Sequence, residues 1–312
     1  MTGIGKGVLR FDLFAVFNRF GRRFQNERAA KHGFTPVSDG FQHHLNWYRA
    51  HKTPYEIYCV DRATELAARG HQAAKSIFLE GGAEFDIYMA YLSATGMAEQ
   101  KLPYPATVAL NEKAAFLHYS EKRKSPCNGS LLLIDSGASY CGYGSDITRT
   151  HTTKSVPSEF KSLLQSLDGE QLALCNSIKV GLNFGDLTHE SHMAIARVLL
   201  RHGVLQGIEP EEAIENGLTS ALYPHGVGHL LGLLVHDVGS KQIDITGKTF
   251  VKDEVYTSRI EMRTIESGFL FTVEPGIYFI KTLLTPHKTG KNRNFFNWKL
   301  IERLLPFGGI RI

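Results

Sequence analysis

The sequence lacks any hydrophobic run long enough to cross a bilayer. Its longest apolar stretches, such as residues 131–134 and 269–273, fall far short of the roughly 18 residues that a membrane-spanning helix requires. Its overall composition is also ordinary for a globular protein: 43% of residues are hydrophobic, 21% are charged, and there are 30 glycines and 11 prolines. This composition excludes collagen-like and disordered chains and predicts a folded soluble protein. A chain of 312 residues suggests about two domains, although one large domain also fits.

Cysteine is scarce and widely spaced. The four cysteines are Cys59, Cys127, Cys141 and Cys175, and none forms a Cys-x-x-Cys pair. This spacing excludes a zinc knuckle and favours reduced, structural thiols, as is typical of a cytoplasmic protein.

Excess positive charge is confined to the start of the chain. Residues 1–31 carry a net charge of +5, whereas the other residues sum to −1. A basic arm of this kind could contact nucleic acid or an anionic membrane surface, but it contains neither an aromatic stacking motif nor a dense Lys/Arg run. We therefore predict a solvated leader, with no nucleic-acid or membrane partner. Arg10 and Asp12 interrupt the apolar run at 9–17, which argues against a secretory signal.

Local signals predict a mixture of helices and short strands. Thr53, Pro54 and Glu56 form a capping-box pattern that opens a long helix ending at Leu79. Further helices are expected at 83–95, 158–180 and 186–202, strands at 107–110, 115–119, 130–135, 269–279 and 309–312, and a long loop or hairpin at 240–265. This order indicates an α+β fold rather than regular βαβ alternation.

Two aspartates are placed where a strand turns back on itself. Asp135 ends an apolar strand, and Asp146 follows after a glycine-rich return. A hairpin here would bring the two carboxylates side by side, where their repulsion requires protonation, a cation partner or a metal. Turn aspartates that merely cap a hairpin remain the alternative at this point.

Histidines and a further acid indicate metal binding. His225, His229 and His236 cluster beside glycines, and Glu274 follows an apolar strand just before Pro275. Carboxylates with an imidazole make an oxygen-rich site, which suits Mn²⁺ or a similar divalent ion better than a thiolate zinc site would.

Four ordered motifs carry a family resemblance. The segments LIDSGASYCGYGSDITRT, PHGVGHLLGLLVHD, TVEPGIYF and PFGGIRI closely resemble the metal motifs of the Xaa-Pro dipeptidases (prolidases) of the pita-bread metallopeptidases. The resemblance covers residues 38–312 and implies an α+β fold with a curved antiparallel sheet covered by helices. It further implies a basic leader with a remnant of an N-terminal domain at 1–50, a catalytic domain lacking its last strand at 51–312, and a homodimer for full-length members.

The resemblance also implies a set of site residues. It implies two divalent ions, most simply Mn²⁺, and a peptide substrate of the Xaa-Pro type, with Glu274 passing a proton from the metal-activated water to the prolyl nitrogen. The implied metal ligands are Asp135, Asp146 (bridging), His229 and Glu274; the other catalytic groups are His225, His236 and His118; the substrate-binding groups are Tyr104, Arg311, His225 and His236.

One departure from the family pattern lies at Ile312. Family members continue the GGIRI segment with a glutamate, a fifth ligand that bridges both metals, whereas the sequence here stops at Ile312. For a polypeptide ending there, we expect weak binding of the second metal and impaired hydrolysis of Xaa-Pro dipeptides. The alternatives are a catalytically inactive pita-bread binding domain, or an activity of the related aminopeptidase P type.

Overall fold

The computed structural model describes residues 38–125, 129–249 and 263–312. The basic leader at 1–31, Cys127 and part of the expected loop at 240–265 lie outside the described residues. Within them, no helix combines the length and apolar character needed to span a bilayer. The helices are α3 (Asp39–Arg49), α4 (Pro54–Leu79), α5 (Glu84–Thr95), α6 (Ser158–Ser177), α7 (Phe184–Arg201), α8 (Pro210–Glu215), α9 (Leu218–Leu222), α10 (Lys281–Leu284) and α11 (Trp298–Leu304), with 3-10 turns η1 (Glu99–Lys101), η2 (Asn111–Ala115), η3 (Thr285–Lys288), η4 (Arg293–Phe295) and η5 (Leu305–Phe307). The strands are β1 (Thr107–Leu110), β2 (Leu131–Asp135), β3 (Ser139–Tyr140), β4 (Tyr143–Gly144), β5 (Thr148–Thr152), β6 (Gly276–Tyr278) and β7 (Gly309–Arg311).

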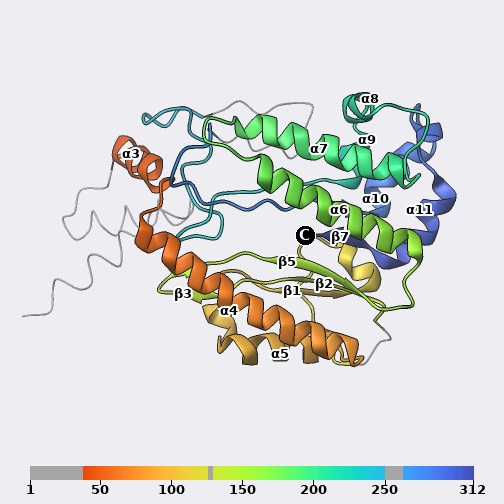
Figure 1. Ribbon diagram of the computed structural model, residues 1–312, viewed down its shortest axis with the longest axis horizontal. Helices are drawn as coiled ribbons and strands as arrows, with labels where there is room; N and C mark the ends of the chain where they lie inside the picture. The colour runs from red at the N-terminus through yellow and green to blue at the C-terminus, as the bar shows by residue number, and fades with distance from the viewer. Residues whose placement is uncertain (1–37, 126–128, 250–262) are drawn as a thin grey trace, which may run out of the picture.

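A three-stranded antiparallel sheet of order β1-β2-β5 lies between two layers of helices. In Figure 1 it crosses the molecule between the α4/α5 pair and the α6/α7 pair. Successive side chains of a strand point to opposite faces. Accordingly, Leu131 and Leu133 of β2 pack in the core formed with α6 and α7, whereas Leu132 and Ile134 pack against α4 and α5. Burial on both faces thus explains the four consecutive apolar residues 131–134 of β2.

The first two expected helices form as predicted. The Oγ1 of Thr53 accepts a hydrogen bond from the backbone N–H of Glu56, and the Glu56 carboxylate accepts one from the backbone N–H of Thr53 at 2.8 Å. Helix α5 ends at Gly96, which adopts a left-handed conformation with φ of 66°. A residue with a Cβ would be strained there, so the glycine ends the helix.

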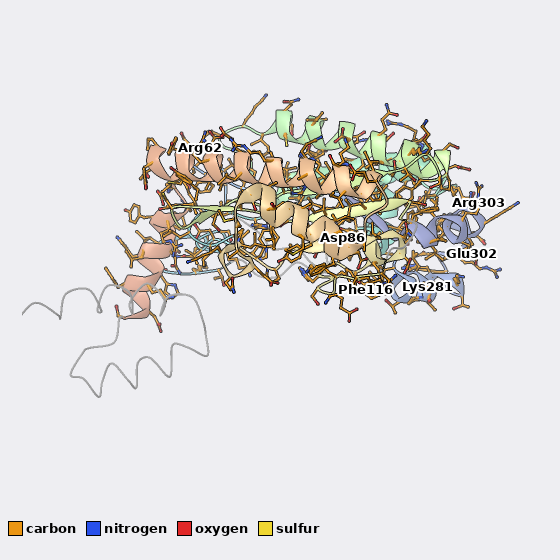
Figure 2. All side chains as sticks on the ribbon, turned by 90° about the horizontal axis from the view of Figure 1, so that it is seen from below. Arg62, Asp86, Phe116, Lys281, Glu302 and Arg303 are labelled. Atoms are coloured by element: carbon orange, nitrogen blue, oxygen red, sulfur yellow. The ribbon has the colours of Figure 1, made fainter. Side chains whose placement is uncertain are left out.

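The expected strand at 115–119 is wrong. Asn111 has a positive φ of 54°, which ends β1 and turns the chain into the 3-10 turn η2. The apolar residues that follow anchor a loop: Tyr119 is buried and its hydroxyl donates to Glu84, whereas Phe116 is 57% exposed at the edge of the molecule (Figure 2). The short apolar stretch at 115–119 therefore belongs to a loop anchored by Tyr119 rather than to a paired strand.

The expected strand at 269–279 is also wrong for most of its length. Only Gly276–Tyr278 forms a strand, β6, which pairs antiparallel with β7. Phe269 and Phe271 make isolated bridges, to His51 and Leu230. Pro275 lacks a backbone N–H and cannot continue a ladder. The residues before it therefore pair with the histidine-rich segment instead, which has consequences for the site.

Candidate metal centre

The two aspartates of the hairpin lie together at one end of the central sheet. Asp135 is the last residue of β2 and is paired in register with Thr148, the first residue of β5, so Asp146 lies just beyond the strand end. The hydroxyl oxygen of Tyr104 lies 2.8 Å from Oδ1 of Asp135 and 2.7 Å from Oδ1 of Asp146. The fold thus brings both carboxylates to one phenol group.

A short stretch of paired backbone joins His229 to Glu274. The N–H of Glu274 donates to the carbonyl of Val227 at 2.8 Å, and the N–H of Thr272 donates to the carbonyl of His229 at 2.9 Å. The Oγ1 of Thr272 accepts from the N–H of His229 at 3.0 Å and donates to Oε1 of Glu274 at 2.9 Å. A Cβ on Gly228 would collide with the Thr272 carbonyl, so only glycine permits this close approach.

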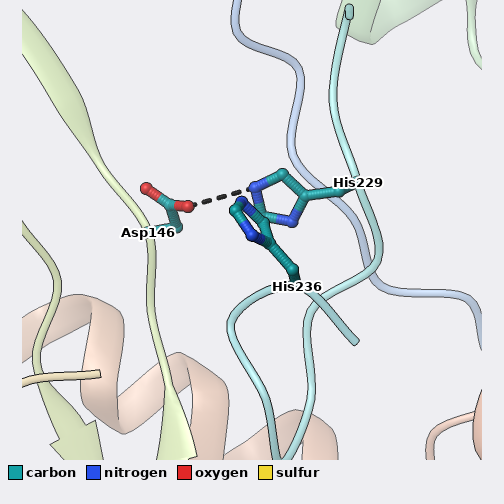
Figure 3. A group of neighbouring side chains, drawn as sticks. All are labelled: Asp146, His229 and His236. Carbon is teal, nitrogen blue, oxygen red and sulfur yellow. Dashed lines mark ion pairs between the residues drawn. The ribbon is translucent and has the colours of Figure 1, made fainter. Parts of the chain in front are cut away.

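His229 connects the acids of the hairpin to Glu274. Its Nε2 lies 3.2 Å from Oδ2 of Asp146 and 3.3 Å from Oε1 of Glu274. Its Nδ1 lies 3.1 Å from the carbonyl of Leu230, and because a carbonyl only accepts, Nδ1 carries a proton. The Nε2 atom is therefore directed at the acids, as Figure 3 shows for Asp146.

His236 lies against His229. The two ring centroids are 4.1 Å apart and the rings are nearly perpendicular, at 88°. Asp146, His229 and His236 each offer a ligand atom, and these atoms lie within 4.8 Å of one another (Figure 3). His236, expected to act on substrate, is therefore also close enough to join the ligand group.

The pKa shifts show how strongly the acids attract positive charge. Burial lowers the pKa of His229, but hydrogen bonds to Asp146 and Glu274 outweigh it and raise the pKa to about 10. Burial raises the pKa of Glu274, but the His229 hydrogen bond and nearby positive charge lower it to about 2. A proton on His229 thus neutralises charge where a cation would be held.

Arg311 supplies a fixed cation. From β7, its Nη2 donates to Oδ2 of Asp135, its Nε donates to Oγ1 of Thr148 at 3.1 Å, and its Nη1 lies 4.0 Å from Oε2 of Glu274. Burial nevertheless raises the pKa of Asp135 to about 6, against the lowering effect of Arg311. Predicted from the family resemblance to bind substrate, Arg311 here contacts the acids.

His225 and His118 lie at the margin of this network. The Nδ1 of His225 donates to the carbonyl of Gly226 at 2.9 Å, and its Nε2 lies 3.0 Å from the hydroxyl of Tyr278. Burial lowers the pKa of His225 to about 4, so the ring is neutral and Nε2 accepts from Tyr278. Burial lowers the pKa of both His225 and His236, and the exposed His118 contributes to the lowering.

The donors fit a divalent metal ion. Three carboxylates and one correctly oriented imidazole form an oxygen-rich, negatively charged set, which hard divalent cations prefer. The Leu230 carbonyl fixes the His229 tautomer, as carbonyls do for metal-binding histidines. The family resemblance predicted that these four residues lie together, as they do, but gave no signal for Thr272, which hydrogen-bonds to both His229 and Glu274.

The chain is similar to several known proteins. A model of metallopeptidase family M24 matches residues 58–312. Xaa-Pro dipeptidase of Proteus mirabilis is 43% identical over 270 residues, covering 86% of this chain and 61% of that protein, and Xaa-Pro dipeptidase of Escherichia coli K12 is 42% identical with the same coverage. Pseudomonas aeruginosa aminopeptidase PepP superposes with a TM-score of 0.66 at 26% identity, covering 94% of this chain and 61% of that one. E. coli aminopeptidase P with the inhibitor Pro-Leu gives 0.68 at 23% identity, covering 95% and 62%. The chain therefore spans about 61% of the length of the curated relatives it matches.

Proposed function

The chain belongs to metallopeptidase family M24, and from this premise we propose that it hydrolyses dipeptides of the Xaa-Pro type with a metal-activated water. Its fold is the expected α+β pita-bread fold. One observation carries the proposal: Tyr104 and His229 join Asp135 and Asp146 of the hairpin to the distant Glu274 in one partly buried network.

The ligand roles follow from these contacts. We propose that Asp146, His229 and Glu274 hold one divalent ion, and that Asp135 and Asp146 hold a second. Bound there, such ions would lower the pKa of a coordinated water and polarise the peptide carbonyl. Glu274 is the acid best placed to move a proton, since its Oε1 is held by Thr272 and its Oε2 faces Arg311.

The surrounding groups bind and orient the peptide. His236 is exposed beside His229, where it can donate to the carbonyl oxygen as negative charge develops on it. In the proposal, His225 and His118 line the side of the substrate site next to His236. Tyr104 and Arg311 keep Asp135 oriented next to the substrate through their hydrogen bonds to its two carboxylate oxygens.

A substrate panel tests the proposal. The Mn²⁺-supplemented chain is assayed with Gly-Pro, Ala-Pro, an Xaa-Pro-Yaa tripeptide and Met-Ala, beside His229→Ala as the metal-site control. We expect hydrolysis of the two dipeptides, abolished in His229→Ala. Cleavage of the tripeptide alone would favour the aminopeptidase P alternative, which the structural likeness to aminopeptidase P supports. Metal binding without any hydrolysis would favour the inactive binding domain.

Three finer points belong to the same proposal. We propose Mn²⁺ as the ion, a homodimer as the assembly and the cytoplasm as the location. Among the described residues, Asp135 and Asp146 are the proposed ligands of one Mn²⁺, whereas Asp146, His229 and Glu274 are those of the other, so we expect the first ion to bind more weakly. Calorimetric titration measures the affinity of each Mn²⁺ site, and sedimentation measures the oligomeric state. Two equally tight sites would contradict the expectation that one site is weak.

A further inference from the structure

A buried ion cluster lies directly behind His236. Asp237, the next residue, has a side chain only 2% exposed, and its Oδ2 lies 3.0 Å from Nζ of Lys52, whose side chain is 1% exposed. Its Oδ1 accepts a hydrogen bond from Nη2 of Arg49 at 2.6 Å. Both carboxylate oxygens of Asp237 are therefore held by cations from one segment, far away in the sequence.

The ammonium group of Lys52 has no spare donor. Besides Asp237, its Nζ donates to the carbonyls of Arg49 at 2.9 Å and Ala50 at 3.3 Å. Its backbone N–H donates to the carbonyl of Gly268 at 2.7 Å. Lys52 is thus fixed at both ends, and it acts as a rigid anchor rather than a flexible surface lysine.

Asp237 transmits this anchoring to the histidines. Its backbone N–H donates to the carbonyl of Leu230 at 2.9 Å, the same carbonyl that accepts from Nδ1 of His229. The loop between them is closed, which sets the ring of His236 against that of His229 (Figure 3). The side chains of Asp237 and Lys52 also pack closely against Gly232 of this loop, where an added Cβ would collide with Oδ2 of Asp237 and lie 3.0 Å from Cε of Lys52.

The anchor comes from the segment just before the part of the chain that the family model matches. Arg49 ends α3 and Lys52 lies in the link to α4, whereas the match to the family model begins at residue 58. Removing two charges from water costs more than their attraction returns in many proteins, so a buried pair is weak evidence of a purely stabilising role. A role in fixing geometry accounts for the cluster better.

We propose that Lys52, assisted by Arg49, is a positioning residue that holds His236 beside the metal centre through Asp237. The inference rests on the proposed function, in that His236 acts on the peptide carbonyl. The structural part of the inference, that the Lys52–Asp237 pair fixes the position of the His236 ring, does not depend on catalysis.

The test replaces both members of the Lys52–Asp237 ion pair with neutral residues. Lys52→Met alone would leave Oδ2 of Asp237 buried without its partner and could unfold the chain, so the main variant is K52M/D237N, which removes both charges of the Lys52–Asp237 pair. The matched control is Lys288→Met, which breaks the exposed ion pair with Glu302, whose position Figure 2 shows. With Ala-Pro and Mn²⁺, we expect kcat of the pair variant to fall about 10- to 100-fold with little change in KM, as for other residues that orient a site. The control should match the parent chain.

A double-mutant cycle that combines K52M/D237N with His236→Ala distinguishes an effect through His236 from a general disturbance of the structure. If the pair acts through His236, K52M/D237N should lower kcat no further once His236 is alanine. An equal loss in both backgrounds would overturn the proposal.

A readout without catalysis keeps the inference separate from the proposed function. The imidazole NMR signal of His236 in the metal-free chain, assigned with His236→Ala, should shift in K52M/D237N, while that of the distant His287 stays in place. A parent chain that cleaves no Xaa-Pro dipeptide would refute the proposed function, and the NMR shift would still support the anchor. An unmoved His236 signal would overturn the anchor whatever the activity.

Discussion

At the scale of single residues, the site depends on atoms with two hydrogen-bonding partners. The Leu230 carbonyl accepts from the His229 ring and from the Asp237 backbone. The Thr272 hydroxyl accepts from the backbone of His229 and donates to Glu274. Such shared atoms fix the relative positions of two functional groups at once, so a small change at one of them disturbs both.

Replacing Thr272 tests this directly. Thr272→Val keeps the shape but loses both hydrogen bonds, so we expect about 1 kcal/mol less stability and roughly tenfold weaker Mn²⁺ binding, as for other groups that orient ligands. Denaturant unfolding and calorimetry provide the measurements. Thr272→Ser keeps the hydroxyl and should resemble the parent chain. Equal losses in Val and Ser would show that the methyl group, rather than the hydroxyl, matters.

At the scale of elements, helix α4 supports the loop that carries the two aspartates. The Oγ of Ser145 donates to the carbonyl of Ala63, and the Nε2 of His71 donates to the carbonyl of Ser136 at 3.0 Å. Ser136 and Ser145 are neighbours of Asp135 and Asp146. The stability of α4 is thereby linked to the geometry of the acids.

The capping box of α4 offers a matched pair of variants. Thr53→Ala removes the side chain that accepts the Glu56 N–H, and we expect a loss of about 1 kcal/mol in the free energy of unfolding. Thr64→Ala lies in the same helix, where alanine has the higher helix propensity, so it should be neutral or slightly stabilising. Urea unfolding followed by circular dichroism compares them. A similar loss in both would rule out the cap as the cause.

At the scale of the whole molecule, each helical layer buries a neutral histidine. His71 of α4 is 7% exposed and His192 of α7 is 2% exposed. Burial lowers the pKa of both to about 4. The folded chain therefore resists protonation at positions where the unfolded chain accepts a proton near its ordinary pKa of about 6.5.

This difference predicts acid sensitivity. As pH falls from about 6.5 to about 4, the unfolded state gains protons first, so stability is lost over that range and levels off below it, by about 3 kcal/mol for each histidine. Urea unfolding of the metal-free chain at several pH values measures the slope. His192→Gln should make the free energy of unfolding depend less steeply on pH between about 4 and 6.5, whatever the stability of this variant at pH 7. An unchanged slope would show that His192 does not contribute.

Local sequence signals determined the elements whose ends are set by local chemistry. The Thr53 capping box, the Gly96 stop and the apolar strand before Asp135 are short-range features, because a helix cap or a left-handed turn depends on neighbouring residues. The family resemblance of the four motifs predicted that Asp135, Asp146, His229 and Glu274 lie together, and the structure brings them into one network. The same signals were wrong at 115–119 and 269–279, where apolar residues serve loop anchoring and bridges to distant segments.

Only the tertiary structure decided how distant segments meet. Arg311 contacts Asp135 because β7 packs beside β5, where the Arg311 N–H donates to the Thr150 hydroxyl. Lys52 reaches Asp237 across the fold, and no spacing in the sequence relates the two. Local patterns encode a residue's own backbone, whereas the partners of a buried charge depend on which chain segments the packed core places side by side.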